Sequence, residues 1–180
     1  MNRRGWMQWI LATLIVAAAV HLGTVYALPR IVMARALARM GPANTMHFGT
    51  PPTAADRRVV RSSPDLLYSS CPFDLSKGPL RLTARVPHTT YWSVSGFDAA
   101  TNNFFVRNDT QVAGDSIEIV ALRRGMKLPP SDGAPIEAVL FVPTERGVFL
   151  VRMAIGNPKD LAALESIQHQ AACATVSDSR

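Results

Sequence analysis

Charge is missing from one long stretch near the start of the chain. Residues 6–28, WMQWILATLIVAAAVHLGTVYAL, contain no charged side chain. As a helix, these 23 residues would span about 34 Å, enough for a bilayer core of roughly 30 Å. Residues 1–40 are therefore predicted to form a transmembrane anchor helix that contacts membrane lipid through residues 6–28.

A cleaved signal peptide is the main alternative. Arg3 and Arg4 precede the apolar run in either case, residues 9–20 form a 12-residue apolar core, and Val25-Tyr26-Ala27 offers a cleavage site. The run is nevertheless long for a signal peptide, and a buried soluble helix is a third reading. The helical pattern also continues beyond the run, with apolar side chains among arginines at Ile31, Met33, Leu37 and Met40. An uncleaved signal anchor is favoured.

Nearly all of the excess of basic over acidic residues lies in this region. The whole chain carries a net charge of +6, but Arg3, Arg4, Arg30, Arg35 and Arg39 supply five of its 19 basic residues. From residue 41 onward, 14 Lys and Arg stand against 13 Asp and Glu, a net charge of +1. These five arginines are placed to contact anionic lipid headgroups. The nearly neutral charge of the chain from residue 41 onward argues against a nucleic-acid partner.

Arginines flank the apolar segment on both sides, so their count does not decide its orientation. A short basic tail before a first apolar segment normally stays in the cytoplasm, and a large domain after it is exported. The expected orientation is therefore N-terminus in and C-terminus out.

Cysteine is also scarce, with Cys71 and Cys173 alone. An even count in a small exported domain makes a disulfide between them plausible, and two unrelated buried thiols are the alternative. No metal site is predicted, because no pair of the four histidines has ligand spacing and no further ligands accompany the cysteines. No cofactor is expected.

The chain is expected to have three parts. Residues 1–40 are the anchor, or a signal peptide, and residues 41–58 are a connector in which Pro42, Pro51 and Pro52 exclude a continuous helix. Residues 59–180 form the exported β-rich domain, long enough for one core.

Apolar residues in that domain mostly alternate with polar ones. In PLRLTARVP, Leu80, Leu82, Ala84 and Val86 face one way, which predicts a strand with one wet face. The segments IEAVLFVP and GVFLVRMAI are expected to form an antiparallel hairpin around residues 144–146. Asn157 and Pro158 then begin a C-terminal helix. The predicted fold is mainly β, an antiparallel β sandwich or curved sheet with a C-terminal α-helix, preceded by the transmembrane helix.

Polar and aromatic side chains crowd together in YWSVSGFDAATNNFFVRND, residues 91–109. A catalytic triad of His88, Ser93 and Asp98 can be drawn, but Ser93 lies in a strand-like run without a nucleophile elbow. No catalytic residue is therefore assigned. Asp98, Asn102 and Asn103 suit a turn that joins two strands, because their side chains bond nearby backbone groups. A ligand or partner surface remains an alternative to this structural role.

Several motifs in the same order resemble the bacterial family called domain of unknown function 1254, over about residues 60–170. The motifs are Asp65 and Tyr68, the DLSKGP turn from Asp74 to Pro79, YWS from Tyr91, and TNNF from Thr101. The resemblance implies a mostly β domain of the bacterial envelope. In longer family members a second domain, numbered 1214, follows, and this second domain is missing here.

These observations predict a single-pass protein of the bacterial inner membrane with a periplasmic domain, or a secreted periplasmic protein if the signal is cleaved. The expected role is a binding module that docks a separate companion-domain protein. An envelope enzyme or small-molecule-binding protein with a polar site around Asp98 and Asn102 is the alternative, and a non-enzymatic role is favoured. The candidate binding residues are Asp74, Tyr91, Ser93, Asp98, Asn102 and Asn103.

Overall fold

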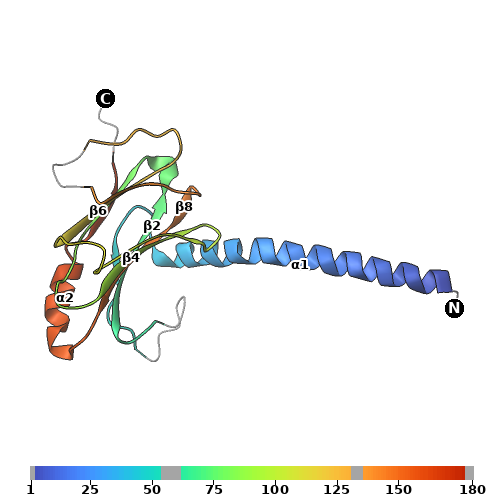
Figure 1. Ribbon diagram of the computed structural model, residues 1–180, viewed down its shortest axis with the longest axis horizontal. Coiled ribbons are helices and arrows are strands. Elements are labelled where there is room, and N and C mark those ends of the chain that lie inside the picture. Colours follow the sequence, from blue (N-terminus) through green and yellow to red (C-terminus); the bar gives the residue numbers. More distant parts are fainter. Residues whose placement is uncertain (1–2, 54–61, 131–135, 177–180) are drawn as a thin grey trace.

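The computed structural model describes residues 3–53, 62–130 and 136–176. A long N-terminal helix, α1 (Arg3–Met40), leads into a β-rich domain (Figure 1). The strands are β1 (His47–Phe48), β2 (Leu66–Asp74), β3 (Leu80–Arg85), β4 (Trp92–Asp98), β5 (Asn103–Asn108), β6 (Ser116–Leu122), β7 (Ala138–Phe141), β8 (Arg146–Ala154) and β9 (Ala172–Thr175). The short helices are η1 (Leu75–Lys77), η2 (Pro158–Asp160) and α2 (Leu161–Gln168).

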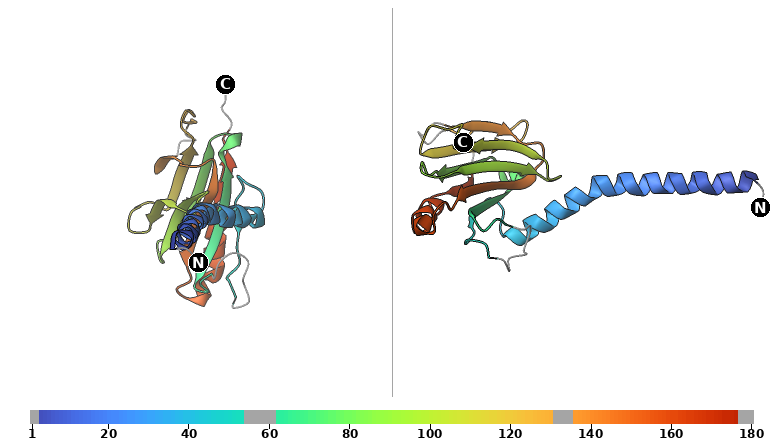
Figure 2. Two further views of the ribbon diagram at one scale, coloured as in Figure 1. Left: turned by 90° about the vertical axis from the view of Figure 1, so that its right-hand side faces the viewer. Right: turned by 60° about the horizontal axis from the view of Figure 1, so that its bottom comes forward.

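Helix α1 is long and apolar enough to cross a membrane, and its most apolar stretch is not buried by the rest of the protein. The predicted continuation of the helix through residues 29–40 is confirmed. Pro29 lies inside it, and the helix bends part-way along its length (Figure 2). Proline lacks the backbone N–H and clashes with the preceding turn, which is the usual cause of such a bend.

The domain consists of two stacked sheets. Among the described residues, sheet A has the strand order β1-β2-β8-β4-β5 and sheet B the order β7-β6-β3-β9. Neighbouring strands run antiparallel except β6 and β7, which are parallel. The predicted fold class is confirmed: the chain is mainly β, with a short C-terminal helix and a long N-terminal apolar helix.

The core lies between the two sheets and follows the predicted alternation. In β3, Leu80, Leu82 and Ala84 are buried, while Arg85 is exposed. From sheet A, Phe73, Trp92, Val94, Phe149 and Val151 fill the opposite side. Burial of these large side chains supplies the main driving force for packing one sheet on the other.

The predicted hairpin of residues 136–155 is wrong. β7 belongs to sheet B, where it pairs with β6, whereas β8 is in sheet A between β2 and β4. Because both edges of β8 are already occupied, β7 has no edge there to join. Val142 continues the β7 pairing by donating its N–H to the Leu122 carbonyl at 2.9 Å, and the chain then crosses to the other sheet.

The C-terminal region begins as predicted and then adds a strand. The Asn157 side chain accepts a hydrogen bond from the Lys159 N–H, with Pro158 in the first helical position. Leu164 is buried against the sandwich. The following strand, β9, pairs with β3 and was not predicted.

Cys71 of β2 and Cys173 of β9 form a disulfide, with 6.3 Å between their Cα atoms. Since β2 belongs to sheet A and β9 to sheet B, the disulfide ties the two layers together.

Part of the expected connector joins the sheet. β1 pairs with β2, and Asn44 hydrogen-bonds to both the N–H and the carbonyl of Asp74. The folded domain therefore includes residues before the expected boundary at residues 58 and 59, which itself lies outside the described residues. A two-residue strand is too short to give an alternating pattern in the sequence.

Candidate functional site

The most polar part of residues 91–109 is the turn between β4 and β5. Asp98 Oδ1 accepts hydrogen bonds from the N–H groups of Ala100 and Asn102, both at 2.8 Å. Asp98 Oδ2 accepts from Asn102 Nδ2 at 3.0 Å. Thr101 adopts a left-handed conformation with φ of 67°, which lets the chain reverse direction here. The carboxylate of Asp98 is thus occupied by its own turn.

The same turn is fixed to the neighbouring strand. Ala99 donates its N–H to Thr144 Oγ1 at 2.9 Å, and Thr144 Oγ1 donates to the Arg146 carbonyl at 2.8 Å. The β4–β5 turn and the start of β8 therefore form one end of sheet A.

Asp74 lies at that end of sheet A as well. Its Oδ1 accepts hydrogen bonds from Ser76 N and Ser76 Oγ at 3.0 and 2.6 Å, and its Oδ2 accepts from Arg146 Nε at 2.9 Å. The hydrogen bonds from Ser76, aided by the Arg146 guanidinium, hold the pKa of the Asp74 carboxyl below its usual value even though burial opposes them. Asp74 is therefore an ionised residue that begins η1 and pairs with β8.

Ser93 occupies a different region, the outer face of sheet A. Trp92 and Val94 point into the core between the sheets, so Ser93 and Ser95 lie on the other face of sheet A, where both are nevertheless buried. Strand register places Arg152 beside Ser93, with Tyr68 on the other side of Arg152. Arg152 Nη2 donates to Ser95 Oγ at 3.3 Å. Within the described residues, Arg152 Nε and Ser93 Oγ are buried without a hydrogen-bond partner.

Sequence reasoning selected Ser93 but missed its neighbours Arg152 and Ser95, and missed Tyr68 on the far side of Arg152. Arg152 is the arginine that interrupts the apolar run of β8, six residues after Arg146 at the start of the strand. Its place opposite Ser93 depends on the register of two strands that are more than 50 residues apart in the chain, and no local pattern encodes that register.

The six candidate residues do not converge on one site. Asp74, Asp98 and Asn102 lie at the end of sheet A near α1, and Asn103 is exposed at the start of β5. Tyr91, which is 42% exposed, lies at the other end of β4 beside a cavity of about 360 Å³ that is also lined by His88 and Asp109.

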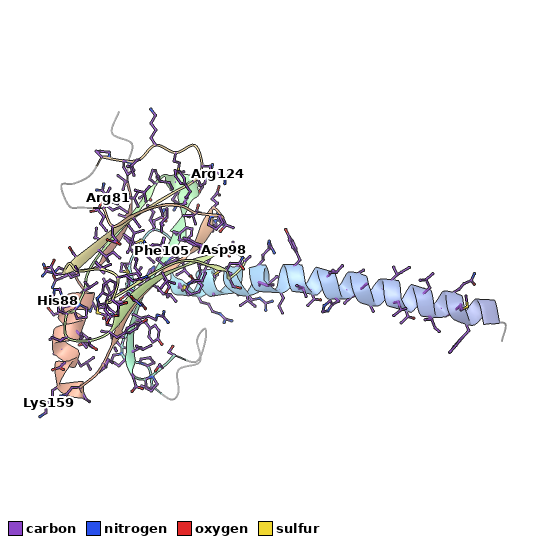
Figure 3. All side chains as sticks on the ribbon, viewed as in Figure 1. Arg81, His88, Asp98, Phe105, Arg124 and Lys159 are labelled. Carbon is purple, nitrogen blue, oxygen red and sulfur yellow. A yellow bond between two sulfur atoms is a disulfide. The ribbon has the colours of Figure 1, made fainter. Side chains whose placement is uncertain are left out.

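The triad residues are also separate. Ser93 and Asp98 are five residues apart along β4, or about 17 Å. His88 and Asp98 lie at opposite ends of the sandwich (Figure 3). No described group of three or more His, Cys, Asp and Glu side chains is placed to hold a metal ion.

Two further cavities lie where α1 meets the domain. One, of about 430 Å³, is bounded by the last turns of α1, including Met33 and Leu37, and by Phe73, Asp74 and Arg146 of sheet A. The other, of about 550 Å³, lies between Val25 and Tyr26 of α1 and Asn102 of the β4–β5 turn. Arg30 lines both cavities.

Comparison with protein families identifies the domain. The family model described as protein of unknown function, DUF1254, matches residues 43–175. The chain belongs to this family. The DUF1254 match begins just after α1 and covers every strand, so the resemblance seen in the sequence motifs is confirmed. None of the curated proteins compared with the chain is similar to it in sequence.

A solved structure shares the fold of this DUF1254 domain. A crystal structure of a protein from Vibrio parahaemolyticus is 13% identical, with a TM-score of 0.64 over 86% of this chain and 36% of its own. A putative uncharacterised protein from Burkholderia cenocepacia is 14% identical, with a TM-score of 0.48 over 89% of this chain and 43% of its own. This chain thus spans about a third of the length of the Vibrio protein.

Proposed function

We propose that this DUF1254 protein is a single-pass protein of the bacterial inner membrane whose periplasmic β sandwich docks a partner polypeptide. Helix α1 has the length and composition to span a bilayer. Exposed aromatic side chains lie near both ends of the apolar segment, Trp6 and Trp9 at one end and Tyr26 at the other. Trp and Tyr are enriched at the two membrane–water interfaces, and these three side chains would lie there. The Cys71–Cys173 disulfide favours an oxidising compartment, and the periplasm is one.

The domain is held close to the membrane surface. The last turns of α1 contact β2 and β8, and Met33 is only 7% exposed. In Figure 1 and in the right view of Figure 2 the N-terminal part of α1 extends away from the sandwich, while its C-terminal end reaches it. An uncleaved α1 would therefore serve as both membrane anchor and packing element.

The observation that carries docking is the length of the solved relative. Because the sandwich accounts for 36% of the Vibrio protein, the fold in that protein is joined to a larger remainder. We infer that a companion domain similar to that remainder docks on the sandwich of this chain.

The end strand of sheet B among the described residues offers a surface for docking. On β7, Val139 and Phe141 are 42% and 61% exposed. An apolar edge strand can both pair with and pack against a partner strand. Aromatic side chains are also enriched at the centres of protein interfaces.

The docking surface is testable by substitution in the tagged, full-length protein. Phe141→Ser should abolish co-purification of a polypeptide that carries such a companion domain. Leu128→Ser is the matched control, because Leu128 is also exposed but is not part of β7. Loss of the partner in both variants, or in neither, would contradict docking at β7.

A second candidate function is the binding of a small carboxylate on the outer face of sheet A. The buried, unpaired Arg152 Nε and Ser93 Oγ favour it, because a guanidinium binds a carboxylate through two parallel hydrogen bonds. Thermal unfolding in acetate, citrate or glutamate tests it. One of these anions should raise the melting temperature of wild type and of Arg124→Gln but not of Arg152→Gln. Equal shifts in all three proteins would exclude this site.

A further inference from the structure

The position of α1 in a bilayer can be deduced from its aromatic residues. Trp6 and Tyr26 are 20 residues apart in the sequence, which corresponds to about 30 Å of helix, the thickness of a hydrocarbon core. Arg30 follows one turn after Tyr26, where its guanidinium would reach the level of the lipid phosphates. It lies over the Tyr26 ring at 3.7 Å from the centroid and donates to the Tyr26 carbonyl at 2.6 Å.

The two cavities at the junction of α1 and the domain meet at Arg30. The cavity nearer the membrane is bounded on one side by the β4–β5 turn and on the other by apolar residues of α1 (Leu22, Val25 and Pro29). The second cavity continues along α1 past Met33, Ala34 and Leu37. Together they offer an apolar path along α1 with an arginine at its middle.

The acidic groups near this arginine are already occupied. Asp74 lines the second cavity but is bonded to Ser76 and Arg146. The Asp98 carboxylate is bonded within its turn. Within the described part of the chain, Arg30 has no carboxylate partner. Its charge is therefore available to an anion from the membrane.

We propose that the junction binds one anionic phospholipid, with its phosphate on Arg30 and its acyl carbons along the apolar wall formed by Leu22, Val25 and Pro29. The proposal rests on the membrane anchoring stated above. The positive charge of the Arg30 guanidinium favours an anionic over a zwitterionic headgroup. Bound lipid would then join the β4–β5 turn to α1 and fix the domain at the membrane surface.

The test uses the full-length protein in nanodiscs of phosphatidylcholine, with or without phosphatidylglycerol. Native mass spectrometry counts the lipids that stay bound after release. Wild type should retain one phosphatidylglycerol, and Arg30→Gln should reduce this retention roughly fivefold. Arg35→Gln is the matched control, because Arg35 is on the same helix but lines neither cavity. It should retain the lipid as wild type does.

A second variant tests the apolar wall. Ala100→Phe fills the cavity between the β4–β5 turn and α1 and should also lower retention, with Arg30 intact. Equal retention in wild type, Arg30→Gln and Ala100→Phe would overturn the site, and so would equal retention of phosphatidylcholine. An intact mass that lacks residues 1–27, or failure to enter nanodiscs, would instead overturn the membrane anchor and the site with it.

Discussion

Asp98 and Asn102 hydrogen-bond to each other and so close the β4–β5 turn. The Asp98 carboxylate accepts hydrogen bonds from both the N–H and the side-chain amide of Asn102, while the Asp98 N–H donates to the Asn102 carbonyl at 3.0 Å. All of these groups are used inside the turn. The pair that suggested a polar binding site in the sequence thus has a structural role.

Asp98→Ala should lower the free energy of unfolding by about 2–3 kcal/mol, because it removes several hydrogen bonds to a buried carboxylate. Thermal and chemical unfolding followed by the fluorescence of buried Trp92 measures the effect. Asn103→Ala is the control, since its exposed side chain should contribute within about 0.5 kcal/mol. An Asp98→Ala protein of unchanged stability that loses partner or ligand binding would instead make Asp98 a binding residue.

The disulfide between the two sheets should contribute strongly to stability. Cys71 and Cys173 are 102 residues apart, and closing a loop of that length stabilises a protein by about 4–5 kcal/mol in the chain-entropy model. The double variant Cys71→Ala, Cys173→Ala should unfold at a correspondingly lower denaturant concentration. Alkylation of unreduced protein from envelope fractions should label neither cysteine. Labelling of both without prior reduction would refute the bond.

The lowered pKa of Asp74 predicts that the stability of the protein depends on pH in the acid range. The pKa of this carboxyl is lower in the folded protein than in the unfolded chain, so its stabilising contribution is present above about pH 4, the usual carboxyl range. The contribution is lost as the pH falls through the lower, folded-state pKa. Asp74→Asn should therefore be less stable than wild type at neutral pH, and this difference should shrink towards pH 3.

Unfolding curves across this pH range measure the effect, with Asp115→Asn as the control. Asp115 pairs with Arg85 at the surface, where an ion pair contributes about 0–1 kcal/mol. A stability difference between wild type and Asp74→Asn that stays constant with pH would contradict the role of the ionised carboxylate.

The orientation in the membrane is a separate prediction. A reporter that is active only in the periplasm should be active when fused after Arg180, and one that is active only in the cytoplasm should be silent there. A short basic tail before the first apolar segment favours this arrangement, although arginines flank both ends of the segment. A cytoplasmic signal at the C-terminus would reverse the topology.

Local patterns predicted much of this fold. The uncharged run of residues 6–28 predicted the long helix, the alternation of Leu80, Leu82 and Ala84 predicted a core-facing strand, and Asn157 with Pro158 predicted the start of the C-terminal helical region. In each of these, the signal lies within a few residues of the feature that it specifies.

Features that depend on contacts between distant parts of the chain could not be predicted from local sequence patterns. β7 and β8 look like a hairpin in sequence, but β2 and β4 occupy the edges of β8. The arrangement of Arg152 beside Ser93 likewise depends on strand register. The contact between α1 and sheet A, which buries Met33, depends on the stacking of the whole domain.

The account's central claim, docking of a partner at the membrane, is tested most directly by co-purification. Tagged full-length protein is extracted from envelope membranes in mild detergent, and the particle is analysed by mass spectrometry and light scattering. The account predicts a stoichiometric complex with a polypeptide that carries a companion domain similar to the remainder of the longer relatives. A folded, monodisperse protein that purifies alone would contradict it.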